Sequence, residues 1–429
     1  MTTRLRESTA DRISNLPDGA IERILVFLPI KDAAKTSLLS RYWRHRWRSI
    51  PQLMFDDRFA PNGNLADDGK EVMMKIYEAL LAHDGLLTKF EVSIPGYRRR
   101  LPPLDLLMLH LSRKGVQELT LRFPDDDYRK LHCSLFSAAF PLKRLKLQRC
   151  ELKVPSGFAG FNKLNLLELE DVSLPDDFYQ NLLPCCPLLE ELRVIGCTGE
   201  EHVFVAPSLK VLLFHSSLLK ISFKCTPLLS VLSVLDTDEY TFEEDSFLDS
   251  NSDMVGLFAS LPALQHLNLG IELLLFLAAD DHVPYKLPQP LHNLRFLEVP
   301  RILLHRLPQA RVLVCLIMSA PNLERLTIRL DDIDEHPPSK AIGSLQKLLE
   351  AEDQLGFCCL QHLEEVNIHD SRGRQVELDL VRFVLATAPV LRRINIQRKE
   401  KLSSKKALKF LNEMIVYKRI SKEAEIKYV

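Results

Sequence analysis

Apolar residues recur along most of the chain as the pattern L-x-x-L-x-L, in which the first, fourth and sixth positions are apolar. Twelve copies follow one another at intervals of 20 to 40 residues. Residues two apart on a β-strand share a face, so each copy predicts a short strand whose apolar side chains point inward. The copies begin at Leu87, Val116, Leu142, Leu164, Leu189, Leu209, Leu229, Leu264, Leu294, Leu323, Leu363 and Leu391.

One copy, from Leu142 to Leu152, completes the leucine-rich-repeat signature, with Cys150 at its Asn/Cys position. A single repeat cannot bury its apolar stripe, whereas stacked neighbours can. The alternative is chance recurrence of a common residue, which twelve ordered copies disfavour. The pattern therefore predicts an α/β fold, an irregular leucine-rich-repeat solenoid of parallel strands with helical connections.

The segments between the predicted strands carry further signals. Asp236–Asp253 holds eight acidic residues and no Lys or Arg, and it predicts a surface loop inserted into one repeat. The tail from Arg392 to Lys427 has twelve Lys and Arg against four Glu, which favours a solvated helix face over a nuclear-import or nucleic-acid role. Apolar residues at helical spacing predict helices at 176–183, 308–319, 339–355 and 376–387.

Before the repeats, Asp11–Asp57 has the pattern of a separate three-helix unit. Pro17 suits the first helical position, and Pro29 ends that helix. Asp32–Leu38 and Ser40–Arg48 predict a second and a third helix. The first helix carries an apolar stripe at Ile21, Ile24, Leu25 and Leu28. Three helices in about 40 residues bury too little surface to be stable alone, so the unit is expected to keep apolar surface for a partner.

Three segments resemble plant F-box/leucine-rich-repeat proteins. Asp11-Arg-Ile-Ser-Asn-Leu-Pro-Asp, with the residues that follow it to Trp47, resembles their F-box; Leu183–Cys197 is typical of their repeats; and Cys359–Ile396 is similar to their C-terminal FBD region. The resemblance implies an F-box at 8–54, leucine-rich repeats at 86–355, and an FBD-like region at 356–429 that continues the repeats. Gly19 and Ala20 depart from the family pattern and weaken the first turn, since Gly costs about 1 kcal/mol relative to Ala in a helix.

The family's role implies the substrate-recognition subunit of an SCF (Skp-cullin-F-box) ubiquitin ligase. Its F-box would bind a Skp-type adaptor, which links to a cullin and a RING subunit, while the repeats hold a target protein. Such a chain is not an enzyme, because its contribution is proximity. The resemblance assigns adaptor contact to Leu16, Pro17, Ile21, Ile24, Leu28, Pro29, Leu39, Ser40 and Trp43. For each apolar residue the alternative is packing within the F-box, and for the chain it is a scaffold without a ubiquitylation role.

The residues between the inward positions are charged in most copies and apolar in the middle of the chain. An exposed apolar patch flanked by charge usually marks an interaction site, so we expect the target there. Permanent burial under a helix or the acidic segment is the alternative. The expected target-binding residues are Ile195, Val211, Leu213, Val231 and Leu235.

Composition and motifs exclude other classes. The net charge of -1 gives no overall attraction to nucleic acid or to an anionic membrane, and Leu273–Ala279 and Val312–Met318 are too short to span a bilayer. Nine scattered cysteines without C-x-x-C favour reduced thiols in the nucleus or cytoplasm. H-E-x-x-H, Walker, G-x-G-x-x-G and G-x-S-x-G motifs do not occur, so we assign no catalytic residue, metal site or cofactor.

Overall fold

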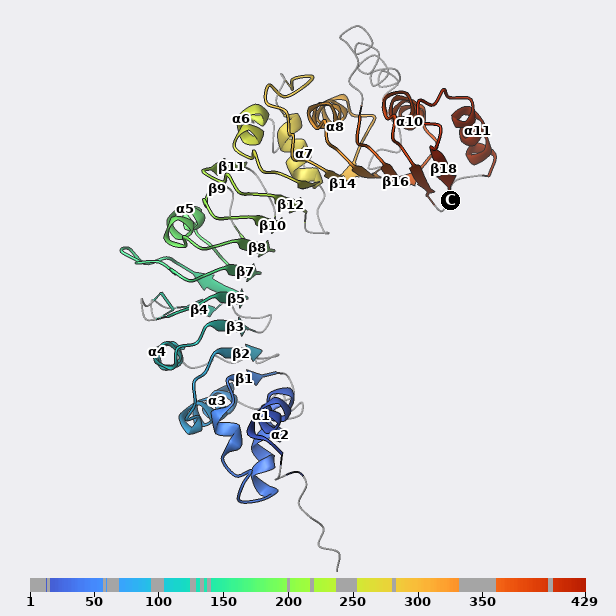
Figure 1. The fold of residues 1–429 in the computed structure, drawn as a ribbon. Coiled ribbons are helices and arrows are strands. Elements are labelled where there is room, and N and C mark those ends of the chain that lie inside the picture. Colours follow the sequence, from blue (N-terminus) through green and yellow to red (C-terminus); the bar gives the residue numbers. More distant parts are fainter. Residues whose placement is uncertain are drawn as a thin grey trace, which may run out of the picture. The chain divides into compact units, whose positions relative to one another are not determined.

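A computed structural model of the chain is shown in Figure 1. It describes residues 13, 16–56, 59, 69–93, 104–123, 129–131, 135–136, 140–198, 201–216, 220–236, 253–279, 283–331, 360–399 and 404–429. The chain forms two compact units, Met1–Pro175 and Asp176–Val429, which are described in turn. The division falls inside the expected repeat region, so the F-box and the first repeats belong to one unit.

Five parallel strands form the sheet of the first unit. In sheet order they are β1 (Gln52–Phe55), β2 (Lys89–Ser93), β3 (Glu118–Arg122), β5 (Arg144–Gln148) and β7 (Leu166–Glu170). One register row joins five side chains that are each at most 2% exposed, namely Leu53, Phe90, Leu119, Leu145 and Leu167. A second layer pairs β4 (Arg129–Leu131) with β6 (Cys150–Leu152).

The helices of the first unit lie mostly before and between its first strands. They are α1 (Asp18–Phe27), α2 (Ile30–Lys35), the 3-10 turns η1 (Thr36–Leu38) and η2 (Arg46–Ser49), α3 (Gly69–Ala82) and α4 (Asp105–Lys114). Helix α4 ends at Gly115, whose φ of 74° lies in the left-handed region that glycine adopts without strain.

The second unit repeats the same design over nine parallel strands. In sheet order they are β8 (Glu191–Ile195), β10 (Val211–His215), β12 (Val231–Leu235), β13 (His266–Leu269), β14 (Phe296–Ile302), β15 (Arg325–Leu330), β16 (Glu365–Ser371), β17 (Arg393–Arg398) and β18 (Glu425–Tyr428). A second layer pairs β9 (Glu201–Val205) with β11 (Lys220–Lys224).

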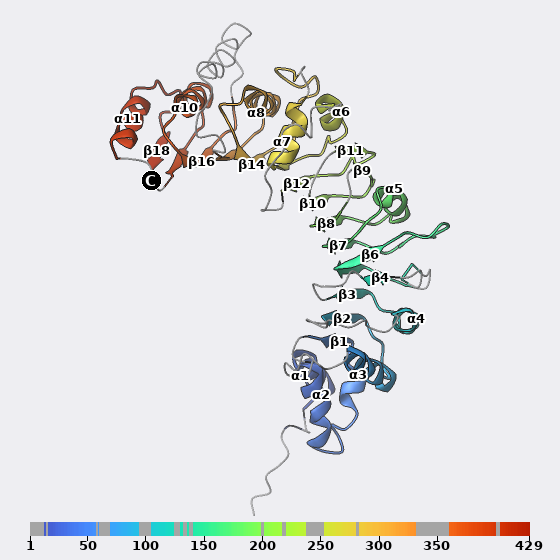
Figure 2. The ribbon, with the colours of Figure 1, turned by 180° about the vertical axis from the view of Figure 1, so that it is seen from behind.

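Helices α8, α10 and α11 of the second unit lie on one side of its strands (Figure 2). The opposite face of the sheet therefore carries the side chains that alternate with the buried leucines. The helices of this unit are α5 (Phe178–Leu182, followed by the 3-10 turn η3, Leu183–Cys185), α6 (Met254–Ala259), α7 (Ile271–Ala278), α8 (Leu307–Ser319), α10 (Gln375–Thr387) and α11 (Ser404–Ile415).

All twelve predicted strands are present, and their inward residues are buried. Strands β1 and β18 were not predicted. β1 does carry the apolar pattern, at Ile50, Leu53 and Phe55, but these residues were assigned to the F-box unit, whereas the corresponding first position before β18 is the charged Glu423. The predicted helices 308–319 and 376–387 match α8 and α10, whereas 176–183 forms only the short α5 and η3. The predicted helix 339–355 lies outside the described residues.

The surface loop predicted at 236–253 lies outside the described residues, apart from its two end residues. Of the acidic segment, Asp236 and Asp253 are described, and both cap helices. The Asp236 carboxylate accepts hydrogen bonds from the Ile271 and Glu272 amides at 3.0 Å, and that of Asp253 accepts one from the Gly256 amide at 2.8 Å. The basic tail is not simply a helix face, because it contains strands β17 and β18 beside α11.

The third predicted F-box helix, Ser40–Arg48, is wrong. This segment forms turns and the 3-10 helix η2, with hydrogen bonds three residues apart, such as Arg46 N to Trp43 O at 3.2 Å and Arg48 N to His45 O at 3.1 Å. Residues 41–48 hold four arginines and a histidine. Like charges three or four apart destabilise an α-helix, which favours the irregular path. Pro17 precedes α1 as its N-cap and not as its first residue.

Candidate protein-binding surfaces

Helix α1 has two apolar faces, and the fold uses only one of them. Ile21 and Leu25, four residues apart, are each 1% exposed and face the F-box interior. Ile24 and Phe27, three residues apart, are 41% and 86% exposed. An aromatic side chain so far out of the core has no packing role in this chain, so it is available to a partner.

The segment that follows α2 adds to this exposed surface. Leu38, at the end of η1, is 88% exposed, and the adjacent Leu39 is 64% exposed. Among the described residues, Leu38 and Phe27 are the two most exposed large apolar side chains. The F-box apolar surface is defined here as Ile13, Ile24, Phe27, Leu38 and Leu39.

The expected adaptor residues divide by burial. Ile24, Leu39 and Pro17 are exposed. Ile21 and Trp43, at 1% and 2% exposed, form the F-box core, as the alternative reading proposed for apolar positions. The half-buried members of the set are Leu16, Leu28, Pro29 and Ser40. Sequence reasoning missed Ile13, Phe27 and Leu38; the three-residue spacing of Ile24 and Phe27, beside the Ile21–Leu25 pair, would have indicated a second face.

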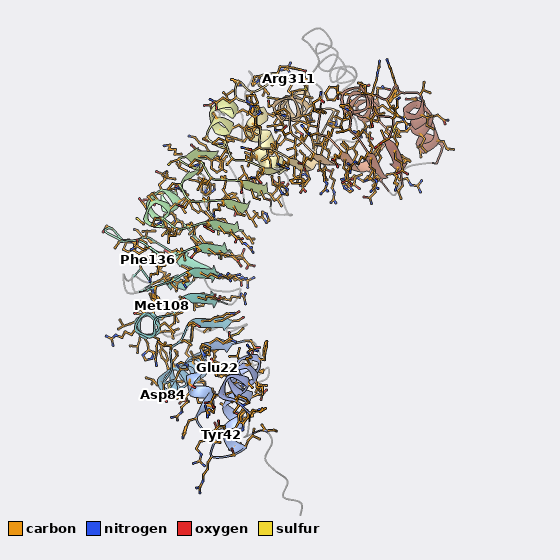
Figure 3. All side chains as sticks on the ribbon, viewed as in Figure 1. Glu22, Tyr42, Asp84, Met108, Phe136 and Arg311 are labelled. Carbon is orange, nitrogen blue, oxygen red and sulfur yellow. The ribbon has the colours of Figure 1, made fainter. Side chains whose placement is uncertain are left out.

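A polar cluster fastens the turn segment to the start of α1. The Tyr42 hydroxyl donates to Asp18 Oδ1 at 2.8 Å, and Arg46 Nη2 lies 2.9 Å from the same oxygen. The Arg46 guanidinium also stacks over the Tyr42 ring, which Figure 3 labels, at 4.3 Å. The Tyr42 hydrogen bond, with the charge of Arg46, lowers the pKa of Asp18, and the same bond raises the pKa of Tyr42. An ionised Asp18 in the first turn supports the helix that Gly19 weakens.

The second surface lies on the open face of β8, β10 and β12. Val211 and Val231 are register partners. His215 is the register partner of both Ile195 and Leu235 on the two adjacent strands. Leu213 lies between Arg193 and Ser233 in the same way. The structure thus brings together all five expected target-binding residues, which we call the middle-strand patch, and leaves each half-buried: Ile195, Val211, Leu213, Val231 and Leu235.

Polar and aromatic groups border the middle-strand patch. On β8, Arg193 Nε donates to Glu191 at 2.6 Å. Beyond β12, the His266 ring lies 5.6 Å from the Phe296 ring, and the Arg325 guanidinium lies over the same Phe296 ring at 5.6 Å from its centroid. Burial lowers the pKa of His215 within the patch, so this ring stays neutral and adds no charge. The patch is therefore an apolar surface inside a polar frame, which is the usual anatomy of a protein interface.

Two observations concern groups that could carry chemistry among the described residues. No three His, Cys, Asp or Glu side chains of that part of the chain gather as a metal site would require. Burial raises the pKa of the Cys315 thiol to about 11, which keeps it protonated. Searched over the same residues, no helix has the length and apolar character needed to cross a membrane.

Comparison with known proteins matches both ends and the middle of the chain. The F-box domain matches residues 13–53, the LRR repeats of FBD-associated F-box protein At5g56370 match 104–328, and FBD matches 358–396. F-box/FBD/LRR-repeat protein At1g13570 of Arabidopsis thaliana is 30% identical over 423 residues, which cover 98% of each chain. The chain belongs to the F-box/FBD/LRR-repeat family. A second family member from that plant, Putative F-box/FBD/LRR-repeat protein At4g03220, is 26% identical over 90% of this chain and 89% of its own.

Membership of the F-box/FBD/LRR-repeat family confirms the plant-type resemblance and the helical F-box followed by leucine-rich repeats. It also agrees with an adaptor-type protein rather than an enzyme. The match to the F-box domain begins at Ile13 and includes all five residues of the F-box apolar surface.

Proposed function

We propose that this protein is the substrate-recognition subunit of an SCF ubiquitin ligase. Its F-box apolar surface binds a Skp-type adaptor, through which a cullin and a RING subunit are recruited, and its repeats hold a target protein. The observation that carries the proposal is the exposure of Phe27 and Leu38 in a segment that matches the F-box domain. The chain itself supplies proximity and no reacting group.

The adaptor contact is expected to depend on a few anchors. Burying a Phe or Leu side chain is worth about 1.5–3 kcal/mol, and anchors at the centre of an interface dominate its affinity. Ile21 and Trp43 contribute indirectly, since they hold the helices that present the anchors. Substitution of either residue would unfold the F-box and would not separate binding from stability.

The adaptor test uses exposed residues. Phe27→Asp and Leu38→Asp should each weaken binding of a purified Skp-type adaptor by about tenfold or more, measured by calorimetry. Leu86→Asp is the matched control, because Leu86 is 81% exposed in the same unit but lies outside the F-box match. Unchanged affinity in the Phe27→Asp, Leu38→Asp double variant would refute the assigned surface.

The middle-strand patch is our proposed target site. It is an apolar part of a sheet face that elsewhere carries many charged and polar side chains, and its five residues come from three adjacent strands. Apolar surface of this kind supports protein binding, with the surrounding charges excluding wrong partners.

The target test places aspartates inside and outside the patch. Leu213→Asp with Leu235→Asp should abolish retention of targets on immobilised protein while adaptor binding persists. Leu188→Asp with Leu228→Asp is the matched control, because these leucines are 51% and 49% exposed in the turns before β8 and β12. Proteins retained by the control and lost from the patch variant are targets. An identical set on both variants would remove the patch as the site.

A scaffold that binds the adaptor without promoting ubiquitylation is the alternative function. A reconstituted reaction with adaptor, cullin, RING subunit and a target found above separates the two. Ubiquitylation that depends on Phe27 and on Leu213 supports the receptor. Binding of both partners without target ubiquitylation would favour the scaffold.

A further inference from the structure

Strand β18 has one free edge. Its register partners on β17 are Arg393 to Ile396, and among the described residues no strand pairs with its other edge. The Glu425 amide donates to the Arg392 carbonyl at 3.0 Å, and the Val429 amide donates to the Ile396 carbonyl on β17 at 2.9 Å. Backbone groups alternate sides along a strand, so the amides of Ile426 and Tyr428 point away from the sheet. A free edge of this kind is a template for another strand.

The charges of β18 select one partner and one register. Its sequence is Glu425-Ile426-Lys427-Tyr428. An antiparallel pair of two such strands centred on Ile426 sets Glu425 of each copy opposite Lys427 of the other. Centring the pair on Glu425 or on Lys427 would instead set like charges opposite each other. Opposite charges across a strand pair stabilise it and like charges destabilise it, so the register centred on Ile426 is favoured over these two.

Helix α11, which precedes β18, carries an apolar stripe that the fold leaves exposed. Ala407, Phe410 and Met414 are at most 6% exposed and face the interior. Beside them, Leu408 and Ile415 are seven residues apart on one face, and they are 60% and 65% exposed. Figure 1 shows α11 and β18 together at the last repeat of the second unit, so stripe and free edge belong to the same repeat.

We propose that two copies of this chain associate through their last repeats, with β18 strands paired antiparallel about Ile426. The contact is isologous, since Glu425 and Lys427 of one copy meet Lys427 and Glu425 of the other. Pairing about a two-fold axis places both α11 helices on the same side of the joined strands. In the single chain Lys427 Nζ lies 3.7 Å from Glu425 of its own strand, an exposed pair that is readily exchanged for the intermolecular one.

The test uses the full chain and its mass in solution by light scattering and sedimentation. Lys427→Glu makes the edge all acidic and Glu425→Lys makes it all basic, so each variant alone should be a monomer at concentrations where the natural chain is a dimer. An equimolar mixture of the two variants should restore the dimer, because every cross-strand pair is then of opposite charge. Lys163→Glu, an exposed charge reversal in the first unit, is the control and should leave the dimer intact.

Two further measurements keep the result decisive. Circular dichroism and thermal melts establish that both charge variants fold, as Arg393 is the register neighbour of Glu425 and would face a lysine in one variant. Hydrogen exchange at the Ile426 and Tyr428 amides should be slower in the dimer than in the monomer, and dilution should restore the faster rate. A natural chain that is monomeric up to its solubility limit overturns the proposal, as does a dimer that survives Lys427→Glu or folded variants whose mixture stays monomeric.

Discussion

Leu326→Ala tests the stacked-repeat core at its most constrained point. Leu326 on β15 is fully buried, and its register partners Leu297 and Val366 on the strands to either side are at most 1% exposed. The substitution removes about three carbons, worth about 2.4 kcal/mol at about 0.8 kcal/mol for each. Ladder hydrogen bonds hold β14 and β16 in place, so the cavity cannot close. We therefore expect a total loss of about 3–4 kcal/mol.

Hydrogen exchange is the appropriate assay because a repeat array does not unfold as one unit. Protection of the β14–β16 amides should fall by about 100- to 1,000-fold, and protection of β1–β3 should not change. Thr327→Ala is the matched control. Thr327 follows Leu326 on the same strand but lies half-buried on the open face, so we expect a change of at most about 0.5 kcal/mol. Equal effects of the two substitutions would refute inward stacking.

Two further predictions concern buried titratable groups. His83 Nε2 lies 2.7 Å from the Ile50 carbonyl and therefore donates, and burial, with the Lys114 charge, lowers the pKa of His83. The contribution of neutral His83 to stability should be complete above its unfolded pKa of about 6.5 and lost as the pH falls through the lower pKa of the folded state. Urea melts over a pH series measure this. If the unfolding free energy of His83→Gln has the same slope against pH as that of the natural chain, the prediction is wrong. Native alkylation should modify the exposed Cys225 and spare Cys315, whose pKa burial raises to about 11; modification of Cys315 at the rate of Cys225 would show that its site opens.

The strands were predictable because the sequence of each repeat alternates apolar inward positions with outward ones. Register partners such as Leu192 and Leu212 are separated by one repeat, and the sequence places both at the same position of the pattern. The middle-strand patch followed from the same alternation, since residues beside an inward leucine must face outward. The side-by-side position of Val211 and Val231 depends only on consecutive parallel strands being neighbours.

The F-box was less predictable, because its exposure depends on how short helices pack. A stripe at Ile21, Ile24, Leu25 and Leu28 appears as one apolar face, yet the fold buries Ile21 and Leu25 and turns Ile24 outward. Phe27 and Leu38 were missed because large apolar residues are expected inside. Residues 41–48 also take an irregular path where helical spacing predicted a helix.

Strand β1 ties the F-box to the repeats, and this decides how the adaptor contact can be tested. β1 begins two residues after the buried Ile50, whose carbonyl accepts a hydrogen bond from the His83 ring. The Gln52 side chain on β1 donates to the Val26 carbonyl of α1 at 3.0 Å. Deleting residues 1–50 would leave β1 and the adjoining core uncovered, so lost adaptor binding could reflect unfolding. Phe27→Asp and Leu38→Asp avoid this, because neither side chain contributes to the core that joins the two parts.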